Sequence, residues 1–184
     1  ADFLASGPAP VYVGFGSMAG RNPEKLAKLI FDALAKSGQR GILLTGWGGL
    51  RPELVPDSVF VLDSAPHRWL FPRMAAVVHH GGAGTTAEGL RAGVPSVIVP
   101  FAFDQFFWGA RVKELGLGPD PIPQKNLTAD LLANAIRISV TVFCFSVGCG
   151  VVVLMAVGEG CITAQEVMAN DRRKQSNRTG FMVF

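Results

Sequence analysis

AAVVHHGGAGTTAEGLRAGVPSVIVPFAFDQ, residues 75–105, is the stretch that decides the fold. It contains two short apolar runs, 75–79 and 96–99, separated by a glycine-rich turn and a segment of helical character, 86–91. A strand, a helix and a second strand in this order form a βαβ unit, whose two strands lie parallel in one sheet. The stretch therefore predicts an α/β fold in which ligands bind beyond the carboxyl ends of the strands.

The same alternation extends outward through residues 11–137. Further strands are predicted at 11–15, 41–45 and 59–62, and further helices at 22–36, 67–74, 105–115 and 128–137. We expect an α/β domain of the doubly wound, Rossmann-like type, with an open parallel sheet, over residues 11–137. Residues 1–10 contain Gly7-Pro-Ala-Pro10, which is typical of a linker that enters a domain from a longer chain.

Composition narrows the possible function classes. The chain has 184 residues, of which 49% are hydrophobic and 17% charged, with a formal net charge of +3. These values exclude a disordered chain, and no basic stripe indicates nucleic-acid binding. The three cysteines, Cys144, Cys149 and Cys161, form no C-x-x-C pair, which argues against a disulfide framework and a zinc site. With no secretory signal in residues 1–10, we expect a reducing, cytoplasmic location.

Residues 138–158 carry no charge and do not continue the βαβ pattern. The segment is long enough to cross a bilayer, but Gly148, Cys149 and Gly150 interrupt it and no aromatic belt flanks it. The sequence leaves open a transmembrane span, a buried strand pair, or a segment foreign to the fold, including a chain end read through non-coding sequence. We therefore treat residues 138–184 as an atypical apolar segment and tail.

The turn after residues 75–79 has the composition of an anion site. The strand delivers His80 to the edge of the sheet, and glycines keep the backbone N–H groups accessible ahead of the hydroxyls of Thr85 and Thr86. Free N–H groups and the positive dipole end of a helix favour a phosphate there. The next strand is followed by Asp104 and Gln105, a carboxylate and an amide suited to sugar hydroxyls.

These motifs resemble the donor-binding signature of the family 1 UDP-glycosyltransferases, which have the two-domain GT-B fold. The matching residues are His80-x-Gly82-x-Gly84-Thr85-Thr86, Gly93-x-Pro95, Pro100 and Asp104-Gln105. Gly14-Phe-Gly-Ser17, Thr45-Gly-Trp47, Ala65-Pro-His67 and His79-His80-Gly-Gly are similar to the sterol 3-β-glucosyltransferases and to related bacterial lipid and antibiotic glycosyltransferases. The resemblance covers about residues 11–136 and implies the C-terminal half of a GT-B glycosyltransferase.

The resemblance implies a role in donor binding for each matching residue. Ser17 would lie near the phosphates, Ala65 and His67 at the uracil base, His80, Gly82, Ala83, Gly84 and Thr85 along the diphosphate, and Asp104 and Gln105 at the glucose. Glu88 has two interpretations: it binds the ribose, or it forms a capping box with Thr85. Trp47 either contacts the ligand or plugs the cleft.

The activity that the resemblance implies is sugar transfer with inversion, without metal or other cofactor, from UDP-glucose or a related UDP-sugar to a sterol or another lipophilic alcohol. His80 is the candidate catalytic residue, because it would stabilise the leaving diphosphate. The family's catalytic base lies in an N-terminal acceptor domain that the chain does not contain. We therefore expect donor binding with little or no transfer, an acceptor domain or partner chain, and cytoplasmic or peripheral membrane location, without nucleic acid.

Two alternatives stay open. One is a donor-binding subunit that acts with a separate membrane-bound chain, as in the split GlcNAc transferase of dolichol-linked oligosaccharide synthesis. The other is a Rossmann oxidoreductase, against which the G-x-G-x-x-G spacing would require glycine at Ala19. Among the other candidates, His79 is expected to pack internally, and Trp69 and Trp108 are expected in the core. The acceptor, the sugar and the oligomeric state are left open.

Overall fold

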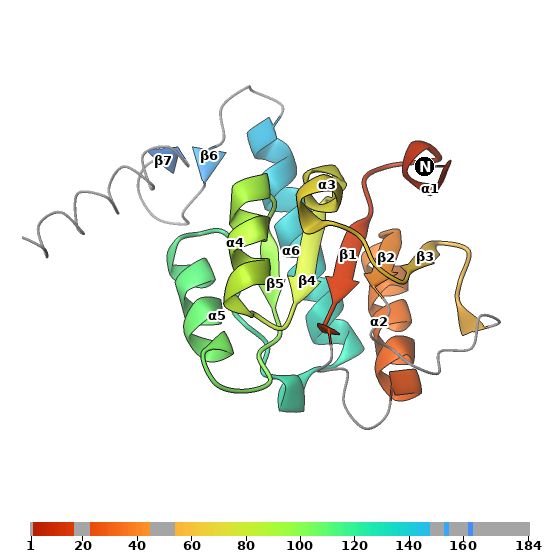
Figure 1. The fold of residues 1–184 in the computed structure, drawn as a ribbon, viewed down its shortest axis with the longest axis horizontal. Helices are drawn as coiled ribbons and strands as arrows, with labels where there is room; N and C mark the ends of the chain where they lie inside the picture. Colours follow the sequence, from red (N-terminus) through yellow and green to blue (C-terminus); the bar gives the residue numbers. More distant parts are fainter. Residues whose placement is uncertain (1, 17–22, 45–53, 148–152, 155–161, 164–184) are drawn as a thin grey trace, which may run out of the picture. The chain divides into compact units, whose positions relative to one another are not determined.

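Five parallel strands form the central sheet in the order β3-β2-β1-β4-β5 (Figure 1). The computed structural model describes residues 2–16, 23–44, 54–147, 153–154 and 162–163, and the chain divides into two units, residues 1–141 and 142–184. The strands are β1 (Val11–Gly14), β2 (Gly41–Leu44), β3 (Val59–Leu62), β4 (Ala76–His79) and β5 (Ser96–Ile98). The helices are α1 (Asp2–Ala5), α2 (Pro23–Ser37), α3 (His67–Leu70), η3 (Phe71–Arg73), α4 (Ala83–Ala92), α5 (Gln105–Glu114), η4 (Gln124–Asn126) and α6 (Ala129–Val147).

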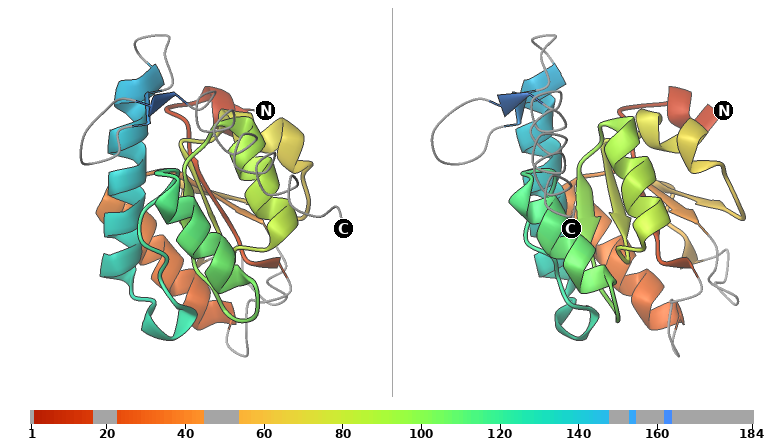
Figure 2. Two further views of the ribbon diagram at one scale, coloured as in Figure 1. Left: turned by 90° about the vertical axis from the view of Figure 1, so that its left-hand side faces the viewer. Right: turned by 60° about the vertical axis from the view of Figure 1, so that its left-hand side comes forward.

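Apolar side chains cover both faces of this sheet, as a doubly wound domain requires. On one face, Val13 and Val78 pack with Ile30 of α2 and Ile136 of α6. On the other face, the buried side chains come from the strands and from α3 and η3, and Gly89 of α4 lies against β4 and β5. Figure 2 shows the strands between these two groups of helices. The α/β fold class predicted from the sequence is thus confirmed.

The predicted strands agree with the observed ones to within one residue at each end, but two helices differ. The helix expected at 86–91 begins at Ala83, because Gly82 is already its N-cap and Gly84 lies within its first turn. The helix expected at 128–137 continues to Val147. A strand pair was one interpretation of residues from 138 on, and it is wrong for 138–147, where no glycine or proline interrupts the helix.

The second unit contains a short antiparallel pair, β6 (Val153–Leu154) and β7 (Ile162–Thr163). Within the described residues, no helix combines the length and the apolarity that a membrane crossing requires.

Residues 2–8, expected as part of a linker, make defined contacts. Phe3 of α1 stacks on Phe60 of the edge strand β3, with ring centroids 5.4 Å apart. The guanidinium group of Arg40 lies 4.1 Å from the centroid of the Phe3 ring and donates a hydrogen bond of 2.9 Å to the carbonyl of Pro8. The chain therefore enters the sheet along a path that aromatic and arginine contacts hold in place.

Candidate donor site

The sheet changes winding direction between β1 and β4. These two strands pair with Gly14 opposite His79, while β1 has β2 as its other neighbour and β4 has β5. The chain therefore leaves β1 and β4 in opposite directions, which opens a crevice at their carboxyl ends. The residues after His79 and after β5 lie at this edge, where the sequence predicts the chemistry.

The loop after β4 is shaped by close packing at Gly81. Gly81 has a φ of +90°, and a Cβ at this position would lie 2.7 Å from Cγ2 of Ile98 and 3.1 Å from the carbonyl oxygen of Gln105. A side chain here would collide with β5 and with the start of α5. Glycine is thus required at position 81 for two reasons: the backbone there has a positive φ, and there is no space for a side chain.

The start of α4 presents free backbone donors. The first hydrogen bond of the helix runs from the N–H of Thr86 to the carbonyl of Gly82, so the N–H groups of Ala83, Gly84 and Thr85 have no intrahelical acceptor. Ala83 and Gly84 are exposed, and Gly82 caps the helix without a side chain. Together with the helix dipole, these donors form a cradle for an anion.

Only one of the two expected threonine hydroxyls remains for this cradle. Thr86 is buried, and its Oγ1 donates a hydrogen bond of 3.0 Å to the carbonyl of Gly82. Because the helix begins three residues earlier than predicted, Thr86 lies in its interior, where a threonine hydroxyl bonds to the preceding turn. Thr85 is half-buried at the N-terminal turn, beside the free N–H groups.

His80 lies next to the cradle. Its Nε2 is 2.6 Å from the place that a Cβ on Gly82 would occupy, so the glycine makes room for the ring. Its Nδ1 is buried and has no hydrogen-bond partner among the described residues. Burial lowers the pKa of His80 below its usual range, against the opposing effect of the Asp104 carboxylate. The imidazole is therefore neutral at pH 7 and can donate one ring N–H.

His79 packs inside the domain, as predicted. It is 0% exposed, and its Nδ1 accepts a hydrogen bond of 3.1 Å from the N–H of Gly81. The pKa of His79 is lowered to about 3. Burial is the largest cause, and the nearby His80 and His67 lower the pKa further. This histidine therefore stays neutral and fixes the turn that carries the cradle.

Asp104 and Gln105 come together at the loop between β5 and α5. The Oε1 of Gln105 accepts hydrogen bonds from the N–H groups of Phe101 at 2.7 Å and Ala102 at 3.1 Å, so this oxygen holds the loop. Asp104 is exposed, and its Oδ2 accepts a hydrogen bond of 3.1 Å from Nε1 of Trp108. The second carboxylate oxygen of Asp104 and the amide nitrogen of Gln105 are the groups left for a ligand.

His67 takes part in an aromatic cluster with Tyr12. The two side chains share a hydrogen bond of 3.3 Å between the Tyr12 hydroxyl and the His67 Nε2, and the His67 ring stacks on Phe71 at 4.4 Å. Gly14 makes this possible, because a Cβ there would lie 2.2 Å from the Tyr12 hydroxyl. Burial raises the pKa of Tyr12 to about 12, so the hydroxyl stays protonated. Ala65, half-buried, packs against the same cluster.

Glu88 does not form the capping box. The helix is capped by Gly82, so Thr85 is not at the N-cap and Glu88 lies in the second turn. Its carboxylate instead forms ion pairs with Arg91 and, at 3.7 Å, with Arg68. The alternative, a ribose contact by Glu88, stays a prediction.

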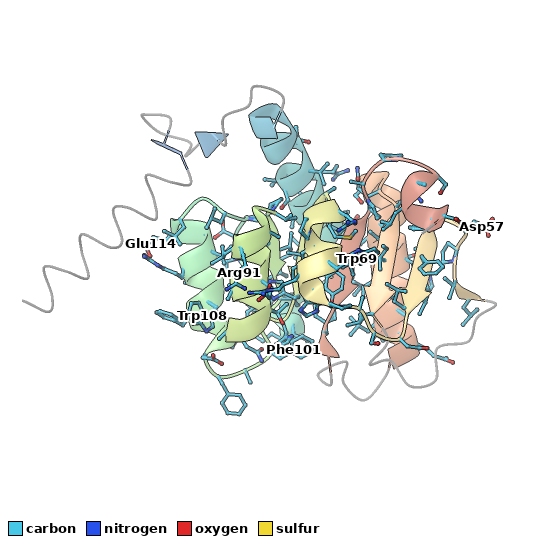
Figure 3. All side chains as sticks on the ribbon, turned by 45° about the horizontal axis from the view of Figure 1, so that its top comes forward. Asp57, Trp69, Arg91, Phe101, Trp108 and Glu114 are labelled. Carbon is cyan, nitrogen blue, oxygen red and sulfur yellow. The ribbon has the colours of Figure 1, made fainter. Side chains whose placement is uncertain are left out.

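The two tryptophans expected in the core lie elsewhere. Trp69 is 48% exposed, and the guanidinium group of Arg73 covers its ring at 4.6 Å. Trp108 is half-buried, and its Nε1 donates the hydrogen bond to Asp104. Figure 3 shows Trp69 and Trp108 on the outer helices α3 and α5. Apolar neighbours in the sequence predicted burial, but each tryptophan has a charged partner four residues away in the chain: Arg73 of η3 for Trp69, and Asp104, the N-cap of α5, for Trp108.

Two candidates, Ser17 and Trp47, lie outside the described residues.

Sequence reasoning missed two residues at this edge, Tyr12 and Phe103. Tyr12 follows the apolar pattern of β1 and gives no separate signal. Phe103 has a left-handed backbone, with a φ of +55°, which no feature of the sequence indicates.

Among the described residues, no group of three or more histidine, cysteine and acidic side chains is arranged to hold a metal ion.

Residues 47–144 match the family described as erythromycin biosynthesis protein CIII-like, C-terminal domain. The chain belongs to this family. It is thus the C-terminal domain of a family 1 glycosyltransferase, in agreement with the resemblance found in the motifs.

Relatives of this EryCIII-like domain include plant proteins named sterol 3-beta-glucosyltransferases. The chain is 52% identical over 137 residues to the sterol 3-beta-glucosyltransferase UGT80B1 of Arabidopsis thaliana, covering 73% of this chain and 22% of that protein. The chain therefore spans about a fifth of the length of this relative.

Solved structures share the fold of the EryCIII-like domain. The glycosyltransferase VinC in complex with DTDP superposes with a TM-score of 0.62 and 28% identity, covering 76% of this chain and 36% of that one. UGT89C1 of Arabidopsis thaliana, complexed with UDP-L-rhamnose, gives a TM-score of 0.57 and 25% identity over 70% of this chain and 33% of that one. The matched part of this chain thus corresponds to about a third of each of these chains.

Proposed function

We propose that the chain binds the donor, UDP-glucose or a related UDP-sugar, of an inverting glycosyltransferase whose acceptor is a sterol or another lipophilic alcohol. The observation that carries the proposal is the free start of α4 beside the ring of His80, whose Nε2 lies next to Gly82, the N-cap of the helix. The similarity to a sterol 3-beta-glucosyltransferase and to a protein complexed with UDP-L-rhamnose supports the same donor class.

In this proposal the diphosphate lies on the N–H groups of Ala83, Gly84 and Thr85. As the bond to the sugar breaks, negative charge grows on the leaving phosphate. The dipole of α4 and the ring N–H of His80 stabilise this charge. Since His80 is neutral and half-buried, its hydrogen bond to the phosphate strengthens as that charge develops.

The sugar end of the donor would lie at the loop between β5 and α5. The exposed carboxylate of Asp104 accepts from two sugar hydroxyls, and the amide nitrogen of Gln105 donates to another. In line with the resemblance found in the motifs, we expect the 184-residue chain to bind the donor and to transfer little or no sugar by itself.

Replacing His80 by alanine is expected to weaken the binding of UDP by about tenfold or more, because a hydrogen bond to a charged phosphate is lost. Calorimetric titration of the wild-type chain and of His80→Ala with UDP and UDP-glucose, without divalent metal, measures the change. Lys113→Ala is the matched control, since Lys113 is an exposed residue at the far end of α5.

Circular dichroism of each variant establishes that the fold is retained. Equal affinity of the His80→Ala and wild-type chains for UDP would remove His80 from the phosphate site. A folded wild-type chain without affinity for UDP would contradict the proposed donor site itself.

A further inference from the structure

Phe103 is the one non-glycine residue with a positive φ in the described part of the chain. Its φ of +55° is the left-handed conformation, which costs a side chain with a Cβ about 1–2 kcal/mol. Its phenyl group is also 89% exposed, more than any other large apolar side chain among the described residues. A glycine at this position would avoid both costs.

The conformation of Phe103 is imposed by its neighbours. On one side, the N–H groups of Phe101 and Ala102 donate to the Oε1 of Gln105. On the other side, Asp104 accepts from Trp108, and the N–H of Gln105 donates to the carbonyl of Ala102 at 3.3 Å. The loop is thus fixed at both ends, and the phenyl group of Phe103 is presented to the solvent in a single backbone conformation.

The place of this phenyl group is next to the proposed sugar site. Phe103 directly precedes Asp104, so its Cα lies one peptide from that of the residue proposed to bind the sugar hydroxyls. A hexose ring has C–H groups on one face and hydroxyls around its rim. Pockets for such molecules combine a few polar groups with apolar and aromatic side chains.

We propose that Phe103 determines donor specificity by packing its ring against the C–H face of the transferred hexose. The proposal rests on the donor site proposed above. Asp104 and Gln105 bind the hydroxyls at the rim of the sugar, and Phe103 covers the face between them. Covering the sugar would also shield the exposed phenyl group from water, which recovers part of the cost of the strained backbone.

The test separates affinity for the sugar from affinity for the nucleotide. UDP and UDP-glucose are titrated into the wild-type chain and into Phe103→Gly, Phe103→Trp and Phe107→Ala. Phe107 is the matched control, as an exposed phenylalanine on the adjacent turn of α5. The quantity compared is the ratio of the two dissociation constants, UDP over UDP-glucose.

In the wild-type chain we expect this ratio to exceed one. We expect it to fall about fivefold in Phe103→Gly, with the affinity for UDP unchanged. The ratio stays at the wild-type value in Phe103→Trp, which keeps an aromatic ring, and in Phe107→Ala. The thermal midpoint of Phe103→Gly is not expected to fall, because glycine adopts this φ without strain.

Each other outcome overturns the inference. An unchanged ratio in Phe103→Gly would mean that the phenyl group covers a different surface, and a ratio of one in the wild type would mean that the sugar is not contacted. An equal loss of affinity for UDP and UDP-glucose would mean that Phe103 only supports the loop. If the folded wild type binds neither ligand, the proposed function fails as well, which distinguishes the two failures.

Discussion

Replacing Gly81 by alanine is expected to lower the free energy of unfolding by about 3 kcal/mol. One part of this loss is the left-handed backbone, with a φ of +90°, and the other is the collision of the new Cβ with Cγ2 of Ile98 at 2.7 Å and the carbonyl oxygen of Gln105 at 3.1 Å. Backbone atoms give way less than the end of a side chain does. Urea denaturation measures the loss, which corresponds to a thermal midpoint lower by about 6–12 °C.

The same substitution is expected to remove the binding of UDP. The N–H of Gly81 donates to Nδ1 of His79, and the turn places His80 and the start of α4. A displaced turn therefore separates the proposed phosphate ligands from one another.

Gly84→Ala is the matched control for stability. Gly84 lies within α4, and a Cβ there meets no heavy atom within 4 Å among the described residues. Since alanine is the better helix former, we expect a free energy of unfolding equal to that of the wild type or higher by about 0.5–1 kcal/mol. If Gly81→Ala proves as stable as Gly84→Ala, the packing described for the turn is wrong.

Lowering the pH from 7 to 5 is expected to reduce the free energy of unfolding by about 2 kcal/mol through His79 alone. The pKa of His79 is lowered to about 3 by burial, from an unfolded value of 6.5. Between these two values the unfolded chain binds a proton that the folded chain does not. The stabilisation is therefore complete above pH 6.5 and is lost as the pH falls toward 3.

Denaturation with urea at several pH values between 7 and 5 measures this slope for the wild type and for His79→Asn. The asparagine keeps a hydrogen-bond acceptor for the N–H of Gly81 and does not titrate. We expect a lower stability at pH 7 but a smaller loss on acidification. A residual slope is expected, because the pKa values of His67 and His80 are also lowered by burial. Equal slopes in the variant and the wild type would exclude His79 as the cause.

Strand positions and the place of the site could be predicted because both depend on local patterns. Each strand is a short apolar run, and runs that alternate with helices must lie parallel. Parallel strands bring their carboxyl ends to one edge, so His80 and Asp104, each following a strand, had to lie at that edge. The inward position of His79 also follows, since adjacent strand residues point to opposite faces.

The hydrogen bonds of the site could not be predicted, because they depend on where each helix begins and on what packs beside it. The start of α4 at Ala83 gives the Thr86 hydroxyl to Gly82 and removes Glu88 from any capping role. The Oε1 of Gln105 is used by its own loop. A residue's type states what it is able to bind, while its neighbours decide what it does bind.

The sequence by itself determined the α/β fold and the alternation of strands and helices that makes the sheet parallel. It also determined the edge of the sheet at which His80, Asp104 and the glycine turn meet. Both results follow from apolar periodicity and from the positions of glycines, which act over a few residues. Only the tertiary structure decided that Gly81 has no space for a side chain, that Trp69 is exposed and that Phe103 adopts a left-handed backbone. The physical reason is that these properties depend on which elements pack together, here β4, β5 and the start of α5, and on which side chains reach the protein surface. The local sequence pattern determines neither.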